Sequence, residues 1–62
     1  MNNNISSLRT GKHYYFTFTH KPNVYGIICD VDIEKNTFVV YDVNTKGYEI
    51  IPQHRFLNAF VL

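Results

Sequence analysis

Three histidines and one cysteine are the side chains of this sequence that could bind a transition metal or act as a nucleophile with its base: His13, His20, Cys29 and His54. Structural zinc sites have ligand pairs separated by about two to five residues, and the sequence contains no such pair. A catalytic cysteine would need a base, an orienting third group and an oxyanion loop, and no pattern indicates them. We therefore predict no metal site, no cofactor and no enzymatic activity.

Asp30 and Asp32 form the second pattern with possible chemistry, two carboxylates separated by one residue, as in metal-binding DxD motifs. That chemistry needs a nucleotide-binding domain, which a chain of 62 residues lacks. The simpler interpretation is that both side chains lie on the polar face of a strand that enters a turn, where they can pair with Lys35.

The segment GKHYYFTFTH, residues 11–20, contains four aromatic side chains between basic ends. Its alternation predicts a strand whose inward face carries three rings: Tyr14, Phe16 and Phe18. Tyr15 then lies on the opposite face, beside His13. If that face is open, Tyr15 is available to a protein partner or to a nucleic-acid base. If a second sheet or a protomer covers the face, Tyr15 belongs to a core or an interface.

The composition is that of a small folded domain in a reducing compartment. The sequence is 45% hydrophobic, 16% aromatic and 18% charged, with a formal net charge of +1 that argues against a dedicated duplex binder. A single cysteine excludes an intramolecular disulfide, and we expect no signal peptide or membrane span, so a cytoplasmic location is predicted. Frequent Asn, Ile, Lys, Tyr and Phe have AT-rich codons, which is compatible with a phage, a virus or a low-GC bacterium.

The expected organisation is a flexible N-terminal arm, residues 1–8, ending in a short helical turn, followed by one domain, residues 9–62. No segment has a sustained helical period, and turn residues separate five short alternating or apolar runs: 12–20, 24–32, 37–43, 48–51 and 56–62. An open sheet of this size would leave two edges unpaired. The predicted fold is therefore all-β, a five-stranded antiparallel small barrel with a 3₁₀ turn, residues 52–55, before the last strand.

Several finer expectations concern the second strand and the turns. Alternation over residues 24–32 places Tyr25, Ile27, Cys29 and Val31 on one face, with Cys29 pointing inward. Gly26 indicates a bulge or a bend. Asn36 and Gly47 are the residues expected to adopt positive φ in the two hairpin turns.

The segment YGIICDVDIEKNTFVVYDVNTKGYEIIPQHRF, residues 25–56, resembles the SH3-like small barrels, with the closest likeness to their Tudor, KOW and Sm-like branches. The resemblance lies in the order of strands, tight turns and 3₁₀ turn, and it implies a barrel with a binding role without naming a ligand. Tudor domains that bind methylated side chains carry a Tyr after the Asp of the third strand, whereas here Val43 follows Asp42. Tyr25 and Tyr41 could supply two walls of such a cage at most.

Two sets of residues are the candidates for binding. The first set, for a partner or for nucleic acid, combines cations with Tyr15 and its neighbour: Lys12, His13, Tyr15, Lys21, Lys46 and Arg55. The second set contains apolar residues in excess of one small interior and the bare apolar C-terminal strand, and is predicted to form a protein interface: Ile28, Ile51, Phe60 and Leu62.

The leading functional prediction is a non-enzymatic binding module that acts through protein–protein interaction. It would self-associate as a homo-oligomer or dock on a larger partner, as a phage or viral accessory protein that modulates a host factor would do. The alternative is a single-stranded RNA- or DNA-binding barrel that uses Tyr15 and the surrounding cations. Neither prediction involves a membrane or a small-molecule substrate.

Overall fold

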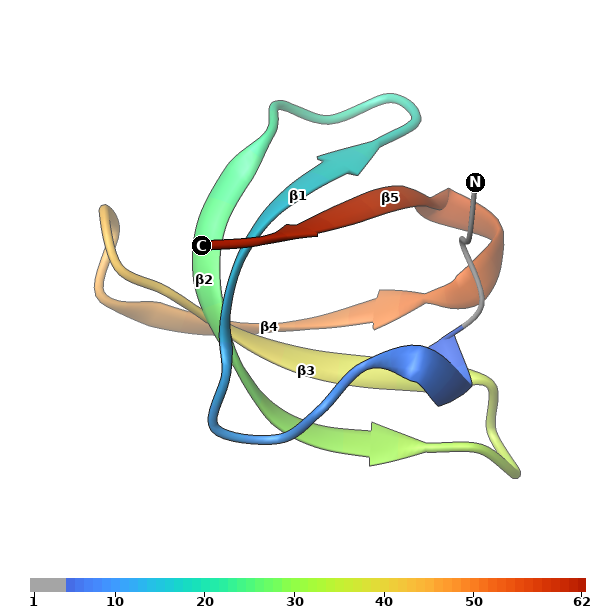
Figure 1. Ribbon diagram of the computed structural model, residues 1–62. Coiled ribbons are helices and arrows are strands. Elements are labelled where there is room, and N and C mark those ends of the chain that lie inside the picture. The colour runs from blue at the N-terminus through green and yellow to red at the C-terminus, as the bar shows by residue number, and fades with distance from the viewer. Residues whose placement is uncertain (1–4) are drawn as a thin grey trace.

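A computed structural model of the chain describes residues 5–62, and its regular secondary structure is almost entirely strand (Figure 1). The described elements are η1 (Ile5–Ser7), β1 (His13–Phe18), β2 (Val24–Asp32), β3 (Thr37–Asp42), β4 (Gly47–Pro52), η2 (Gln53–Arg55) and β5 (Phe56–Val61). The predicted all-β class, the five antiparallel strands and the 3₁₀ turn before the last strand are confirmed.

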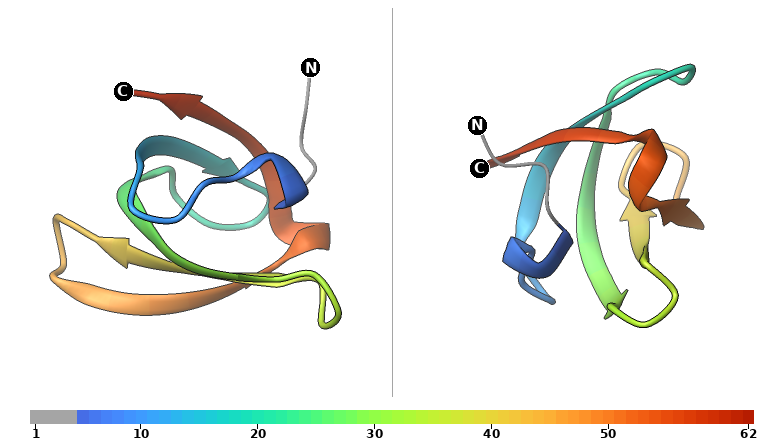
Figure 2. Two further views of the ribbon diagram at one scale, coloured as in Figure 1. Left: turned by 60° about the horizontal axis from the view of Figure 1, so that its bottom comes forward. Right: turned by 90° about the vertical axis from the view of Figure 1, so that its right-hand side faces the viewer.

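The strands form one antiparallel sheet in the order β4-β3-β2-β1-β5, so the first strand lies between the second and the last. The sheet curves around its inner face (Figure 2). Within the described residues, β4 and β5 remain its two edges, without a ladder of hydrogen bonds between them. The predicted closure into a barrel is therefore not found. η2 connects these two edge strands and turns the chain between them.

One ion pair links edge strand β4 to the loop between β1 and β2. Lys21 Nζ lies 3.3 Å from Glu49 Oε1 and 4.6 Å from the centre of the Phe18 ring. Glu49 is directly opposite the buried Val40 of β3, which places its side chain on the inner side of the sheet. Side chains therefore connect parts of the sheet that backbone hydrogen bonds leave separate.

The core lies on the inner face and is rich in aromatic rings. Phe16 is fully buried, and the rings of Tyr14, Phe18, Phe38 and Phe56 lie with their centroids 5.4 to 6.4 Å from its own. These separations are typical of favourable aromatic contacts. The prediction that Tyr14, Phe16 and Phe18 fill the core is confirmed.

The N-terminal segment differs from the predicted arm because part of it belongs to the core. Ile5 and Leu8 are buried, and the Leu8 amide donates to the Ile5 carbonyl oxygen at 3.1 Å. The Ile5 amide also donates to Gln53 Oε1 at 3.0 Å, which holds η1 against η2. The expected helical turn is present as η1. Residues 1–4 of the predicted arm lie outside the described residues.

The predicted faces of β2 are wrong for the first part of the strand, and the bulge is not at Gly26. Val31, after the bulge, packs against the core, on the face predicted to point inward. The pairing register of β2 with β3 shifts between Ile28 and Asp30. The inward and outward alternation of side chains before the shift is therefore not continued after it. Before the shift, Ile28 points inward and Tyr25 outward, and Cys29 at the shift is exposed. Gly26 instead allows a close approach, since a Cβ there would lie 2.8 Å from the Tyr41 carbonyl oxygen.

The two hairpin turns place their left-handed residues differently from expectation in one case. Asn36 has φ 58°, as predicted, but in the second turn Lys46 has φ 60° and Gly47 does not adopt positive φ. Asp42 Oδ1 accepts hydrogen bonds from the Asn44 amide at 2.8 Å and the Thr45 amide at 3.2 Å. In this capped turn, the residue with positive φ is therefore Lys46, one position before the predicted Gly47.

Candidate interaction surface

Three aromatic side chains stand in a row across the outer face of the sheet. Tyr15 of β1 is directly opposite Tyr25 of β2 on one side and Phe60 of β5 on the other. Because directly paired residues project to the same face, the three rings meet, with centroid distances from Tyr15 of 4.6 Å to Tyr25 and 6.5 Å to Phe60. We call Tyr15, Tyr25 and Phe60 the aromatic patch.

The patch combines exposed rings with a fixed centre. Tyr25 is 47% exposed and Phe60 is 54% exposed, whereas Tyr15 between them is half-buried. The Asn23 side-chain amide donates to the Tyr15 hydroxyl at 2.7 Å, which ties the ring to the loop before β2. A partner that covers the patch would therefore order fewer side chains than it would on a flexible surface.

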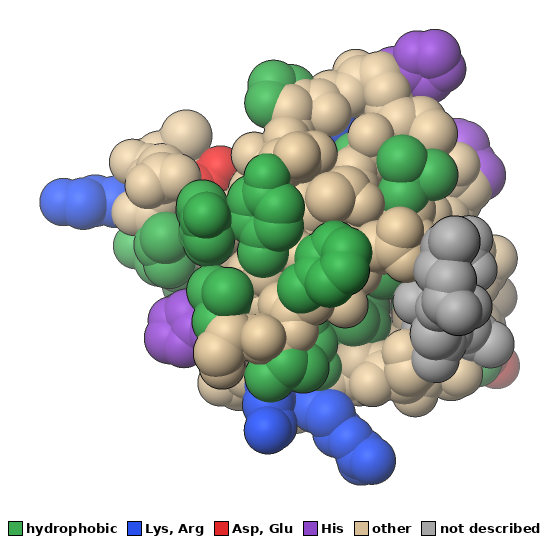
Figure 3. Space-filling view, turned by 45° about the horizontal axis from the view of Figure 1, so that its top comes forward, with side chains coloured by type: hydrophobic (Ala, Val, Ile, Leu, Met, Phe, Trp, Pro, Cys, Tyr) green, Lys and Arg blue, Asp and Glu red, His purple; other side chains and the backbone are tan. Residues whose placement is uncertain are grey.

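A second row of side chains, without Lys, Arg, Asp or Glu, continues the outer face. His13 is opposite Ile27, which is opposite Tyr41, and Tyr41 is opposite the exposed Tyr48. The Tyr41 and Tyr48 rings lie 5.1 Å apart. Figure 3 shows hydrophobic side chains gathered over β1 and β5, with Lys and Arg side chains at the margin of the view. Neither row contains Lys, Arg, Asp or Glu.

The predicted cations are not brought together around Tyr15. Lys12 precedes β1, Lys46 lies in the turn between β3 and β4, and Arg55 lies in η2, all exposed. Lys21 is half-buried and engaged by Glu49 and the Phe18 ring. Of the first candidate set, only His13 and Tyr15 lie on the outer face close to each other.

The predicted interface residues divide into two pairs. Ile28 and Ile51 are 1% and 2% exposed, so they are core residues and their assignment to an interface is wrong. Ile28 faces inward opposite the buried Val40, and Ile51 faces inward opposite Phe38. Phe60 and Leu62 are exposed, as an interface requires.

Two members of the outer face, Tyr25 and Tyr48, were not expected there. Alternation continued through the bulge places Tyr25 inward, and no sequence pattern indicates Tyr48 as a binding residue. The turn residues Pro22 and Asn23 indicate a hairpin between these strands. Its centre at His20, whose φ is 62° in the structure, pairs Tyr15 with Tyr25. Pairing of Tyr15 with Phe60 has no comparable local signal.

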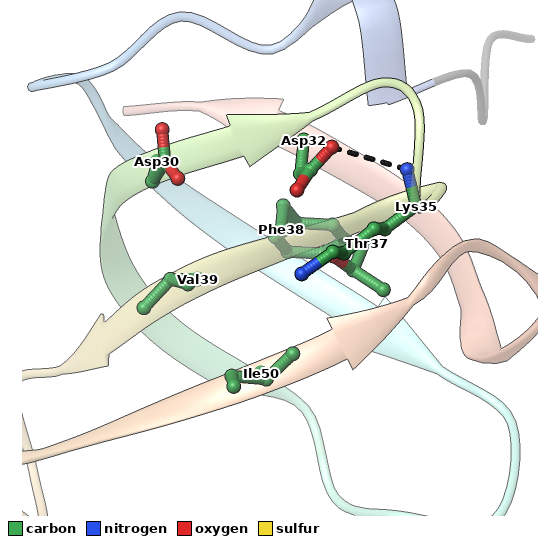
Figure 4. Close-up of a pocket in the computed structure, with 7 residues that line it drawn as sticks. All are labelled: Asp30, Asp32, Lys35, Thr37, Phe38, Val39 and Ile50. Atoms are coloured by element: carbon green, nitrogen blue, oxygen red, sulfur yellow. Dashed lines mark hydrogen bonds between the residues drawn. The ribbon is translucent and has the colours of Figure 1, made fainter.

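A depression of about 240 Å³ lies beside the hairpin between β2 and β3 (Figure 4). Its lining residues are Asp30, Asp32, Lys35, Thr37, Phe38, Val39 and Ile50. Asp32 Oδ1 accepts a hydrogen bond from the Lys35 backbone amide at 3.1 Å, so this carboxylate caps the turn. Among residues 5–62, no group of three or more His, Cys, Asp and Glu side chains is placed to hold a metal ion.

The comparisons with known proteins identify no relative: no family model, no curated protein and no solved structure is significantly similar to this chain. The part of the chain that the structure describes contains no helix with the length and hydropathy needed to cross a membrane.

Proposed function

We propose that this chain is a non-enzymatic interaction module that binds protein through the aromatic patch. The observation that carries the proposal is the position of Tyr15, Tyr25 and Phe60 side by side on an exposed face of the sheet. Neither the row that they form nor the next row contains Lys, Arg, Asp or Glu. Tyrosine and phenylalanine are enriched in the centres of protein interfaces, and charged residues are depleted there.

Covering the patch with a partner would be energetically favourable. The exposed parts of Tyr25 and Phe60 are apolar surface that remains in water in the isolated domain. Covering them with a partner gains about 25 cal/mol for each Å² of apolar surface removed from water. The hydrogen bond from Asn23 leaves the Tyr15 hydroxyl satisfied, so its burial in an interface would not strand a polar group.

We also infer that the fold is an open variant of the SH3-like small barrels. Two features support the inference: β1 lies between β2 and β5, and η2 lies between β4 and β5. A Tudor-type cage has less support, because Tyr25 packs on Tyr15 while Tyr41 packs on Tyr48, in a different row of the face.

The test is site-specific photo-crosslinking in cells that express the chain. A benzophenone amino acid replaces Tyr25 or Phe60, and as a control it replaces Glu34, which is exposed in the turn after β2. We expect irradiation to join the 7.3 kDa chain to protein at the two patch positions and not at Glu34. If neither patch position gives a protein adduct above the control, the proposal is wrong.

A second candidate function is single-stranded nucleic-acid binding, which one observation favours. Rings exposed side by side on a sheet are the arrangement on which successive bases stack. Fluorescence anisotropy with labelled oligothymidine and oligouridine at low salt would show binding, and Tyr15→Ala would weaken it. The dispersed positions of Lys12, Lys46 and Arg55 give this candidate less support. An absence of binding at low salt would exclude it.

A further inference from the structure

We propose that the occupant of the aromatic patch is a second copy of this chain, in a two-fold symmetric dimer. This inference rests on the proposed function and names its partner. The starting observation is the layout of the patch: Tyr15 is the centre, with one exposed ring on each side, Tyr25 on β2 and Phe60 on β5.

The charge distribution suits contact between identical surfaces. In a two-fold dimer both sides of the interface carry the same groups, so an ionised residue near the axis would lie close to its own copy. The two rows of the outer face contain no Lys, Arg, Asp or Glu, and the net charge of the chain is only +1. Two such faces therefore approach each other without like-charge repulsion.

The geometry defines a simple two-fold arrangement. An axis that runs parallel to β1, in the interface plane over Tyr15, exchanges the two sides of the patch. Phe60 of each copy then faces Tyr25 of the other, and the two Tyr15 rings meet at the axis. Leu62 extends the same face, because its amide donates to the His13 carbonyl oxygen at 3.3 Å and its side chain is exposed.

The size of the domain gives a reason for self-association. A chain of 62 residues buries only about 60% of the surface that its unfolded form exposes, less than larger domains bury, so its core gives little stability and an oligomer interface would add to it. Its single cysteine cannot form an internal disulfide. An ordinary interface covers about 800 Å² on each partner, about a fifth of the 4154 Å² surface of the described residues.

The experiment measures the mass of the full chain by sedimentation equilibrium, from about 1 µM to about 1 mM. We expect the wild-type chain to reach twice its 7.3 kDa mass. Phe60→Glu and Tyr25→Lys, each alone, should raise the dimer Kd at least about tenfold. The double variant should recover dimerisation, because the new carboxylate of one copy then faces the new ammonium of the other. Ile33→Glu, an exposed apolar position in the turn after β2, is the matched control and should remain dimeric.

Circular dichroism checks that each variant folds, and a second measurement does not depend on variants. Dilution of the wild-type chain should shift the NMR signals of Tyr15, Tyr25 and Phe60 and leave those of the β2–β3 turn unchanged. A wild-type chain that stays monomeric up to about 1 mM would overturn the inference, as would dilution shifts located elsewhere. A monomeric chain that crosslinks to another protein at Tyr25 would refute the dimer and leave the proposed function standing.

Discussion

Gly26 is the residue whose identity is most tightly fixed by its neighbours. It lies in β2, the middle strand of the sheet, opposite Tyr14 of β1 and Asp42 of β3. A Cβ at this position would meet the Val40 side chain and lie 2.8 Å from the Tyr41 carbonyl oxygen. Backbone atoms of a central strand cannot move away easily, so the absence of a side chain is a packing requirement.

Gly26→Ala should destabilise the domain by about 1–3 kcal/mol, the usual cost of overpacking a core. The free energy of unfolding from urea titration measures this directly. Gly47→Ala is the matched control, since its Cβ would approach nothing closer than Thr45 Oγ1 at 3.8 Å. Equal stability of the two variants would show that β2 adjusts to the added methyl group.

Single residues were predictable from the sequence where local geometry alone decides their position. Asn36 was identified because its side chain favours the left-handed conformation. The prediction for Gly47 is wrong because the Asp42 side chain caps the Asn44 and Thr45 amides, and in the turn so formed it is Lys46 that adopts positive φ. Tyr15 was singled out correctly as an outward residue, but its two ring partners were not identified.

At the scale of the elements, η1 acts as a cover on one end of the core. It contributes Ile5, which is 1% exposed, and it is anchored by the hydrogen bond from the Ile5 amide to Gln53 of η2. The sequence does not predict that Ile5 is buried, because a single apolar residue in a polar segment shows no periodicity.

Ile5→Ala should therefore lower the free energy of unfolding by about 2–5 kcal/mol, as for other large-to-small changes in cores. Thermal and urea unfolding monitored by circular dichroism would measure the loss. Thr10→Ala, at an exposed position in the same segment, should change stability by less than about 0.5 kcal/mol. An Ile5→Ala variant as stable as the Thr10→Ala variant would mean that η1 does not support the core.

The strands differ in how far alternation predicts their faces. In β1, the inward residues Tyr14, Phe16 and Phe18 follow the pattern throughout. In β2, the register shift after Ile28 changes which residues face inward, so one continued pattern fails. The sequence also does not predict that the sheet stays open, because a strand at the edge of a sheet and a strand in a closed barrel have the same local sequence pattern.

The link between Lys21 and Glu49 should make a small and salt-dependent contribution. Its side chains are 19% and 44% exposed, so solvent weakens the pair. A double-mutant cycle with Lys21→Met and Glu49→Gln should give a coupling energy of about 0.2–1 kcal/mol. Raising the salt concentration should reduce it. Coupling that is zero at low salt would mean that the ion pair does not hold the loop to β4.

For the whole molecule, the absence of Lys, Arg, Asp and Glu from the two rows of the outer face that contain Tyr15 and His13 determines how association responds to salt. Apolar contacts persist or strengthen as ionic strength rises, whereas binding to nucleic-acid phosphates weakens steeply. We expect the sedimentation mass of the wild-type chain to be unchanged between about 0.1 M and about 0.5 M NaCl, a range over which the Debye length falls to a few Å. Association that disappears over this range would point to contacts between charged groups instead.

The candidate surface is less predictable from the sequence than the fold, because it depends on the arrangement of the whole sheet. Tyr15 and Tyr25 are joined by a hairpin, but Tyr15 and Phe60 meet only because the last strand returns to the first. Such a contact depends on the strand order of the complete sheet, which no local pattern encodes.

That return of the last strand also governs how the domain can fold. Tyr14 pairs with Val61, and Phe56 covers the ring of Phe16, so contacts at the centre of the structure join opposite ends of the sequence. Closing so long a loop costs entropy before any contact compensates for it. Folding should therefore take about milliseconds to seconds, as in other domains of high contact order. A chain still being synthesised has to wait for residues 56–61 before its core can assemble.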